Sequence, residues 1–312
     1  MTKLEGRRHF LGTLGAFGCM AFDMRGEQAN RSRPRLGVVT SVAKGSTPAQ
    51  ALGHVRQLGF TTCQLGVGMA PPELAGPIRD AARSNGIEIT ALMTLGEGKM
   101  VWNLRDGPKT IGIIPRETRQ ARVAALKRAS DLAKACGVAA VHTHCGFIPE
   151  NPNEPLYSET VTVIRDVVQY CRNNGQTFLC ETGQETPITL LRAIQDVGLD
   201  NIAVNLDVAN LILYGNGEPV GALDVLRKHV RGLHAKDGLY PTDPYGLGEE
   251  VPIGKGRVRF PEVMAKLRGL SYTGPITIER EISGPRQETD IRASRSYLQG
   301  LIDSAYGQSS GD

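Results

Sequence analysis

The stretch Thr177–Asp207, TFLCETGQETPITLLRAIQDVGLDNIAVNLD, contains the unit that decides the fold. It begins with an apolar run over residues 177–181, continues through an amphipathic segment over residues 187–197, and ends with a second apolar run over residues 202–207. Pro187 suits the first turn of a helix, and Gly198 is typical of a helix C-terminus. Two nearly continuous apolar strands joined by a helix predict a parallel sheet that is covered by helices.

The same unit recurs along most of the chain. Apolar runs with strand character lie at Leu36–Val39, Thr62–Leu65, Ile87–Met93, Ala140–His144, Thr177–Glu181, Ile202–Asp207, Val230–His234 and Ile276–Glu279. Helical segments lie at Pro48–Leu58, Pro72–Ser84, Arg116–Cys136, Glu159–Asn173, Pro187–Val197, Pro219–Lys228, Phe260–Leu267 and Gln287–Ile302. This alternation predicts an α/β protein with a single (β/α)₈ TIM barrel over residues 35–304. A doubly wound open sheet is the alternative, but no G-x-G-x-x-G motif follows the first strand.

The two ends of the chain depart from this pattern. Residues 1–34 hold the twin arginines Arg7 and Arg8, then a Gly- and Ala-rich apolar run, and then a polar segment. This order resembles a twin-arginine export signal, so we expect an exported, periplasmic protein. A disordered basic N-terminus on a cytoplasmic protein is the other interpretation. We expect residues 305–312 to form a flexible C-terminal tail.

The overall composition restricts the kinds of partner. The chain has 36 Lys and Arg against 32 Asp and Glu, and its basic residues are interspersed with acidic ones. We therefore expect neither nucleic acid nor an anionic membrane as a partner. No apolar run reaches the roughly 18 residues that a membrane span requires. The six cysteines show no C-x-x-C spacing, which argues against a structural zinc site. A homo-oligomer and a monomer both stay open.

Ionisable residues stand at the final positions of the fifth to eighth predicted strands. They are, in this order, Glu181, Asp207, His234 and Glu279. The C-terminal ends of barrel strands meet at one rim, so these side chains are expected to converge. Charged groups at the end of a buried strand are costly unless they are paired or bound to a metal. The set predicts one divalent cation, Mn²⁺, Mg²⁺, Co²⁺ or Zn²⁺. An ion-pair network with Lys236 and Arg280 as its cations is the competing interpretation.

The residues around these positions carry a family resemblance. The runs are Cys180–Gly183, Asn205–Asn210, His234–Asp237 and Ile278–Glu281, with Gly254-Lys255-Gly256 and Phe260 between the last two. In these runs the chain resembles the xylose isomerase-like barrel superfamily and, within it, the sugar phosphate isomerase/epimerase family. The resemblance extends over nearly all of residues 35–302. It implies that the four strand-end residues bind a metal, commonly Mn²⁺, and that Glu181 and Glu279 exchange protons with the substrate.

We therefore expect an isomerase or epimerase that depends on a divalent metal and acts on a sugar or keto-sugar. A metal that binds a carbonyl oxygen and an adjacent hydroxyl stabilises an enediolate, and Glu181 and Glu279 can move the proton between its two faces. A lyase or dehydratase that eliminates a β-substituent from a keto-polyol, keto-glycoside or inosose would use the same residues. The candidate cations are scattered, so we expect an unphosphorylated substrate.

Further side chains are predicted to contact this substrate. The full set is His142, His144, Glu185, Asn210, Lys236, Asp237, Trp102 and Tyr240. His142 and His144 share one face of a strand because they are two positions apart. Trp102 and Tyr240 lie in two long segments, residues 95–115 and 235–259, that follow strand C-termini. In the ketose 3-epimerases that the chain resembles, His and Arg stand in place of Asn210 and Tyr240, which argues against that one activity.

Overall fold

The structure, a computed structural model, describes residues 32–42 and 46–307. Parallel strands close into a barrel in the order β1-β10-β7-β6-β5-β4-β3-β2, which confirms the predicted TIM barrel. The strands are β1 (Arg35–Ser41), β2 (Thr62–Gly66), β3 (Glu88–Met93), β4 (Ala140–His144), β5 (Thr177–Glu181), β6 (Ile202–Asp207), β7 (Val230–Ala235) and β10 (Pro275–Ile278). A small antiparallel pair, β8 (Asp237–Gly238) and β9 (Glu250–Val251), lies outside the barrel.

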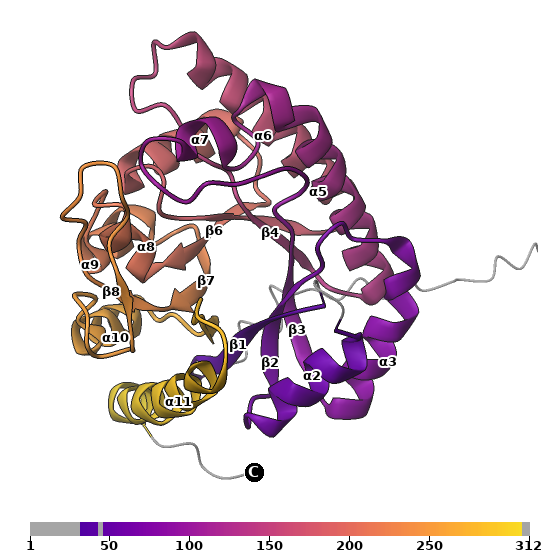
Figure 1. Ribbon diagram of the computed structural model, residues 1–312, viewed down its shortest axis with the longest axis vertical. Helices are drawn as coiled ribbons and strands as arrows, with labels where there is room; N and C mark the ends of the chain where they lie inside the picture. The colour runs from indigo at the N-terminus through magenta and orange to yellow at the C-terminus, as the bar shows by residue number, and fades with distance from the viewer. Residues whose placement is uncertain (1–31, 43–45, 308–312) are drawn as a thin grey trace, which may run out of the picture.

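Helices surround the barrel on its outside (Figure 1). The long ones are α2 (Pro48–Gln57), α3 (Ala75–Asn85), α5 (Arg116–Cys136), α6 (Pro155–Asn173), α7 (Pro187–Val197), α9 (Pro219–Leu226), α10 (Phe260–Gly269) and α11 (Pro285–Tyr306). Shorter ones are the 3₁₀ turn η2 (Pro72–Leu74), α4 (Gly107–Thr110) and α8 (Val208–Leu213). Several features differ from the sequence prediction: α6 begins with Pro155 rather than Glu159, α11 begins with Pro285 rather than Gln287, and α4, α8 and the β8–β9 pair were not expected.

The two ends of the described chain lie close together. The Arg33 guanidinium donates to the carbonyl oxygen of Gly307 at 2.8 Å. Residues 1–31 of the expected signal and residues 308–312 of the expected tail lie outside the described residues. The last helix continues to Tyr306, beyond the expected start of the tail. Within residues 32–42 and 46–307, no helix is both long and apolar enough to cross a bilayer.

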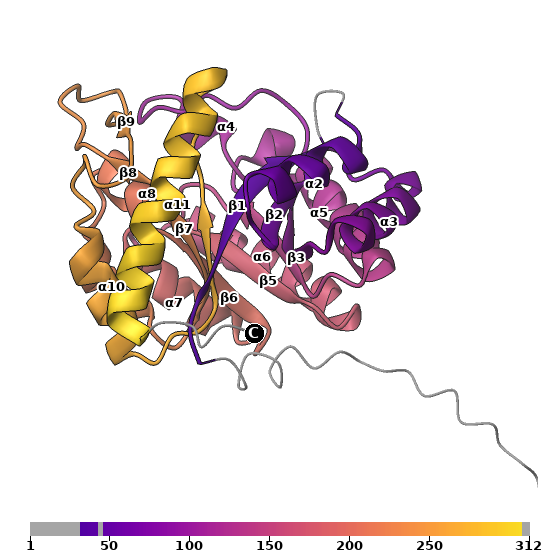
Figure 2. The same ribbon diagram turned by 90° about the horizontal axis from the view of Figure 1, so that it is seen from below.

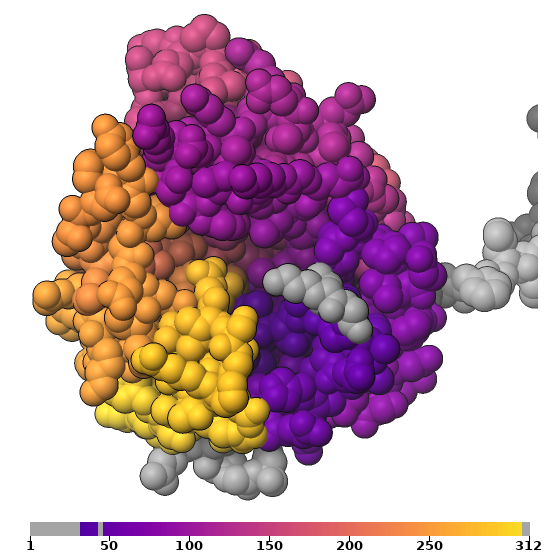
Figure 3. Space-filling view, viewed as in Figure 1, coloured from indigo at the N-terminus to yellow at the C-terminus, as the bar shows by residue number. Residues whose placement is uncertain are grey.

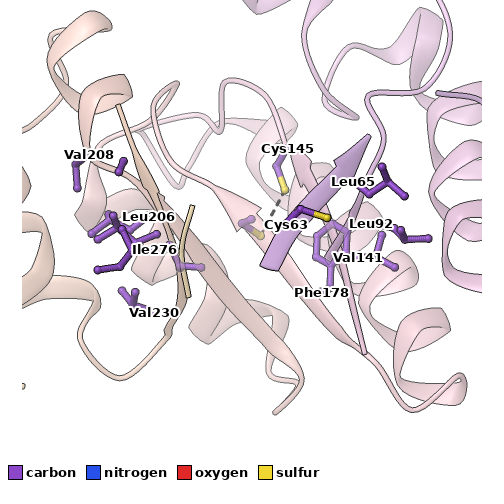
Figure 4. Close-up of a cluster of buried hydrophobic side chains, with 14 of the residues drawn as sticks. Cys63, Leu65, Leu92, Val141, Cys145, Phe178, Leu206, Val208, Val230 and Ile276 are labelled. Atoms are coloured by element: carbon purple, nitrogen blue, oxygen red, sulfur yellow. Dashed lines mark hydrogen bonds between the residues drawn. The ribbon is translucent and has the colours of Figure 1, made fainter. Parts of the chain in front are cut away.

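Alternate residues of the barrel strands face the helices and the barrel axis. Val141, Phe178 and Leu206 belong to the apolar layer between strands and helices (Figure 4). Their neighbours point to the axis, where a separate small cluster is formed by Ala91, Ala140, Leu179 and Ala203. Side chains two positions further along β4, β5 and β6 return to the same inner face. These are polar, so the inside of the barrel changes from small apolar groups to ionisable ones at its C-terminal end.

Two long loops rise from this C-terminal end and meet above it (Figure 2). They are the β3 loop (residues 95–115) and the β7 loop (residues 236–259). The N–H of Leu104 donates to the carbonyl oxygen of Tyr245 at 2.9 Å, and the Arg105 guanidinium lies 5.4 Å from the Tyr245 ring centroid. The loops therefore hold each other in place across the barrel.

The β3 loop is also fastened to the helix that follows it. Arg122 of α5 is only 1% exposed, and its guanidinium donates to the carbonyl oxygens of Gly112 at 2.7 Å and Glu97 at 2.9 Å. One buried side chain therefore ties the two ends of the loop together. Trp102 lies between these two attachment points.

Candidate metal centre

The four strand-end residues converge at the C-terminal rim of the barrel. One ligand atom from each of Glu181, Asp207, His234 and Glu279 lies within 4.8 Å of those of the others. His234 Nδ1 is 3.1 Å from Glu181 Oε1, 3.4 Å from Glu279 Oε2 and 3.6 Å from Asp207 Oδ2. The structure thus brings together the whole predicted ligand set around one imidazole nitrogen.

The orientation of Asp207 follows from its position between β6 and α8. Its Oδ1 accepts the backbone N–H groups of Ala209 at 2.9 Å and Asn210 at 2.7 Å, as the N-cap of a helix does. Its Oδ2 is buried and makes no hydrogen bond in the described part of the chain, although the Lys236 ammonium lies 3.2 Å away. A buried carboxylate oxygen without a donor is costly, so this atom fits a cation ligand.

Gln64 on β2 sets the tautomer of His234 through the ring nitrogen that does not face the carboxylates. Gln64 Nε2 donates to Asn205 Oδ1 at 2.8 Å, which leaves Gln64 Oε1 to face His234 Nε2 at 2.7 Å. An amide oxygen accepts a hydrogen bond, so Nε2 is assigned the proton. Nδ1 is then the nitrogen that faces the carboxylates, and it can bind a metal when it gives up its own proton. Metal-binding histidines in proteins are commonly oriented in this way.

Two further histidines surround Glu181. The Nε2 atoms of His142 and His144 lie 3.0 Å and 3.1 Å from Glu181 Oε2. Asn210 Nδ2 donates to the other oxygen, Oε1, at 3.3 Å. The Trp102 ring meets the edge of the His144 ring with centroids 5.1 Å apart. The structure therefore brings these four predicted substrate residues to the centre.

The ionisable groups strongly perturb one another. Burial would raise the pKa of Glu181, but the three neighbouring imidazoles outweigh it and hold the pKa well below its ordinary value. Burial would lower the pKa of His234, but the Glu279 and Glu181 carboxylates outweigh it, so this pKa lies well above its ordinary value. Burial would raise the pKa of Glu279 as well, but Lys236 and His234 outweigh it and hold this pKa below its ordinary value. These directions favour the ionised form of Glu181 and Glu279.

A cavity of about 730 Å³ opens beside this cluster. His144, Asn210 and Glu279 line it on the inner side, and Trp102 and Leu95 contribute apolar surface from the β3 loop. Figure 3 shows the corresponding hollow between the β3 loop, the β7 loop and the start of α11. Its volume suits a small organic ligand.

The comparisons with known proteins agree with this geometry. Residues 52–301 match the family described as xylose isomerase-like TIM barrel. The chain belongs to this family. It is 34% identical to a xylose isomerase domain protein from Planctomyces limnophilus, whose crystal structure it matches with a TM-score of 0.82 over 88% of this chain and 100% of that chain.

Solved structures of lower sequence identity share the fold. A family protein from Mycobacterium smegmatis, crystallised in complex with magnesium, is 20% identical, with a TM-score of 0.65 over 86% of this chain and 97% of that one. D-Psicose 3-epimerase, crystallised in the presence of D-fructose, is 15% identical, with a TM-score of 0.64 over 88% of this chain and 100% of that one. The chain spans half the length of an uncharacterised Methanocaldococcus jannaschii protein, to which it is 26% identical over 152 residues, 45% of this chain.

Within this xylose isomerase-like barrel, three predicted substrate residues lie elsewhere. The Asp237 carboxylate accepts backbone N–H groups of the β7 loop, including those of Gly254 at 2.9 Å and Gly256 at 3.0 Å, so it holds that loop. Tyr240 is 46% exposed and does not line the cavity. Glu185 is buried and outside the cavity lining, and burial raises its pKa. Their substrate contacts stay predictions.

Sequence reasoning missed two residues of the centre, Gln64 and Asn205. Each carried a signal, because a lone amide inside an otherwise apolar strand needs a buried hydrogen-bond partner. Asn205 stands two positions before Asp207 and therefore shares its inward face. Gln64 and Asn205 orient the imidazole of the quartet, whose three carboxylates and one imidazole can hold a divalent cation.

Proposed function

We propose that the protein is an isomerase or epimerase of an unphosphorylated sugar or keto-sugar and that it depends on a divalent metal, with Mn²⁺ preferred. The proposal rests on the convergence of Glu181, Asp207, His234 and Glu279 beside a cavity of ligand size, which Glu279 lines. The magnesium complex of the Mycobacterium smegmatis relative and the sugar named with D-psicose 3-epimerase support the cofactor class and the substrate class.

The charge of the cavity lining favours a substrate without phosphate. Arg280 supplies the one guanidinium of that lining in the described residues, and the lining holds no lysine. Arg280 is already paired, with Nη1 2.9 Å from Glu250 Oε1 and Nε 3.0 Å from Asp290 Oδ2. A phosphate would meet Glu279 and Glu281 in the lining without a free cation to bind it.

The chain's own residues account for the proton transfers. A divalent ion in the quartet would supply positive charge next to two substrate oxygens, which favours an enediolate. Glu181 ends β5 and Glu279 follows β10, so their carboxylates reach the centre from strands that are not neighbours in the barrel, and Glu279 lines the cavity. One removes a proton from the carbon next to the carbonyl, and the other returns it on the opposite face. His144 and Asn210 line the cavity with groups that hydrogen-bond hydroxyls.

Hydrogen exchange tests this proposal. The protein is depleted of metal, reloaded with Mn²⁺ and incubated in D₂O with unphosphorylated ketoses, keto-glycosides and inososes, and the products are followed by NMR. We expect solvent deuterium at the carbon next to the carbonyl only after reloading. Glu181→Gln and Glu279→Gln should abolish it, whereas Glu117→Gln, an exposed change on α5, should not.

The products decide the reaction class. An epimer or aldose–ketose pair supports the proposal, whereas loss of a β-substituent assigns the same centre to a lyase. Full turnover by both glutamine variants at positions 181 and 279 would show that these residues do not move the proton.

A further inference from the structure

Lys236, which follows β7 directly, places a cation at the metal centre. Its side chain is only 1% exposed. The ammonium Nζ lies 2.8 Å from Glu279 Oε2 and 3.2 Å from Asp207 Oδ2. These are the same two oxygens that face His234 Nδ1 at 3.4 Å and 3.6 Å. Lys236 therefore contacts the same oxygens of Asp207 and Glu279 that a metal bound to His234 Nδ1 would use.

A third carboxylate binds the same ammonium from outside the quartet. Glu281 Oε1 lies 3.3 Å from Lys236 Nζ, and the Glu281 side chain is 58% exposed and lines the cavity. Lys236 thus contacts two members of the quartet and one carboxylate outside it. Its four-carbon chain can shift the ammonium between these partners without any change of the backbone.

We propose that Lys236 is a built-in counter-cation that competes with the divalent ion for Asp207 and Glu279, and that Glu281 retains the ammonium when the ion binds. This inference rests on the proposed metal centre. Without a metal, the ammonium offsets the mutual repulsion of buried carboxylates, so the centre stays assembled. With a metal, the ammonium and the dication share oxygens at short range and repel each other, which weakens metal binding. Lys236 is in this sense a positioning residue that lowers metal affinity.

The sign of one substitution separates this role from a purely structural one. Lys236→Met removes the competing charge, so we expect Mn²⁺ to bind about tenfold tighter or more, the equivalent of at least ~1.4 kcal/mol. The metal-free variant should unfold at a lower temperature than the metal-free parent protein. A lysine that only orients Asp207 and Glu279 predicts weaker binding instead. Lys236→Arg keeps the charge and should stay within a few fold of the parent protein.

Glu281 supplies a second, independent test. Of the three carboxylates paired with the ammonium in the described residues, Glu281→Gln leaves Asp207 and Glu279, so Mn²⁺ should bind several-fold more weakly. In the Lys236→Met background there is no ammonium to retain, and the effect of Glu281→Gln should shrink. A double-mutant cycle measures this coupling directly. Equal effects of Glu281→Gln in both backgrounds would contradict the retaining role.

The experiment is calorimetric titration of the metal-depleted proteins with MnCl₂ and MgCl₂, with thermal unfolding in parallel. Lys255→Met is the matched control, since it removes the same charge from an exposed position of the β7 loop and should leave affinity unchanged. If Lys236→Met does not fold without metal, it is purified with Mn²⁺, and its rate of metal loss to EDTA should be slower than that of the parent protein.

The outcomes separate two failures. A parent protein that binds Mn²⁺ while Lys236→Met binds it equally or more weakly, or loses it faster, overturns the counter-cation role alone. A parent protein that binds neither Mn²⁺ nor Mg²⁺ overturns both this role and the proposed function.

Discussion

Arg122 offers a quantitative test of how the wall of the cavity is held. Its two short hydrogen bonds join a charged donor to the carbonyl oxygens of Gly112 and Glu97. Bonds of this kind contribute about 1.5–3 kcal/mol each, and a third contact to Lys99 at 3.5 Å adds little. Methionine restores part of the apolar packing of the arginine stem. Arg122→Met should therefore lower the free energy of unfolding by about 3–6 kcal/mol.

Urea unfolding followed by circular dichroism gives this free energy. Trp102 is the only tryptophan in the chain and lies in the loop that Arg122 holds, so its fluorescence reports the loop separately. We expect the emission of folded Arg122→Met to shift towards that of a solvated indole. Arg128→Met on the same helix is the control, because its contacts are long, at 3.4 Å to Met69 and 3.5 Å to Glu97. A loss below 1 kcal/mol with unchanged emission would refute the reasoning.

Three further predictions follow from the fold and the centre. Gly112→Ala should prevent stable folding, because its Cβ would lie 2.0 Å from the backbone carbonyl oxygen of Cys145. Gly137 has nearly the same φ but open space around it, so Gly137→Ala should lower the free energy of unfolding, measured by denaturation, by only about 1–2 kcal/mol. Metal-free protein should lose up to about 1.4 kcal/mol of stability per pH unit above pH ~6.5, because folded His234 has a raised pKa and keeps a proton that the unfolded chain releases. Unfolding curves from pH 6.5 to 9 measure this loss, and bound Mn²⁺ should remove it. Trp102→Ala should raise KM about tenfold, whereas Tyr240→Ala, outside the cavity lining, should change it less than about twofold in steady-state kinetics.

The strands could be predicted because each is an apolar run between glycine-rich or polar turns. Helix α8 could not, because Val208–Leu213 continues the apolar run of β6 without any helical period. It is the carboxylate of Asp207 that ends the strand and caps the helix, and one side chain with two functions has no distinct sequence pattern. The early start of α6 has a simpler reason, since Pro155 occupies its first turn.

The convergence of the four strand-end residues could be predicted because barrel geometry brings strand ends together whatever the loops do. Side-chain directions in the loops carry no such rule. Lys236, Asp237 and Tyr240 all stand shortly after the seventh strand, but of these three only Lys236 turns to the centre. Gln64 was missed for a different reason, since its partner Asn205 is far away in sequence and becomes a neighbour only when the barrel closes.

Metal content tests the central claim most directly. Purified protein is metal-depleted, incubated with excess Mn²⁺, dialysed and assayed by inductively coupled plasma mass spectrometry, together with folded Asp207→Ala and Glu279→Ala variants. A single centre formed by Glu181, Asp207, His234 and Glu279 predicts about one Mn²⁺ per chain in the parent protein and much less in either variant. No bound metal in the parent protein, or equal retention in the variants, would contradict it.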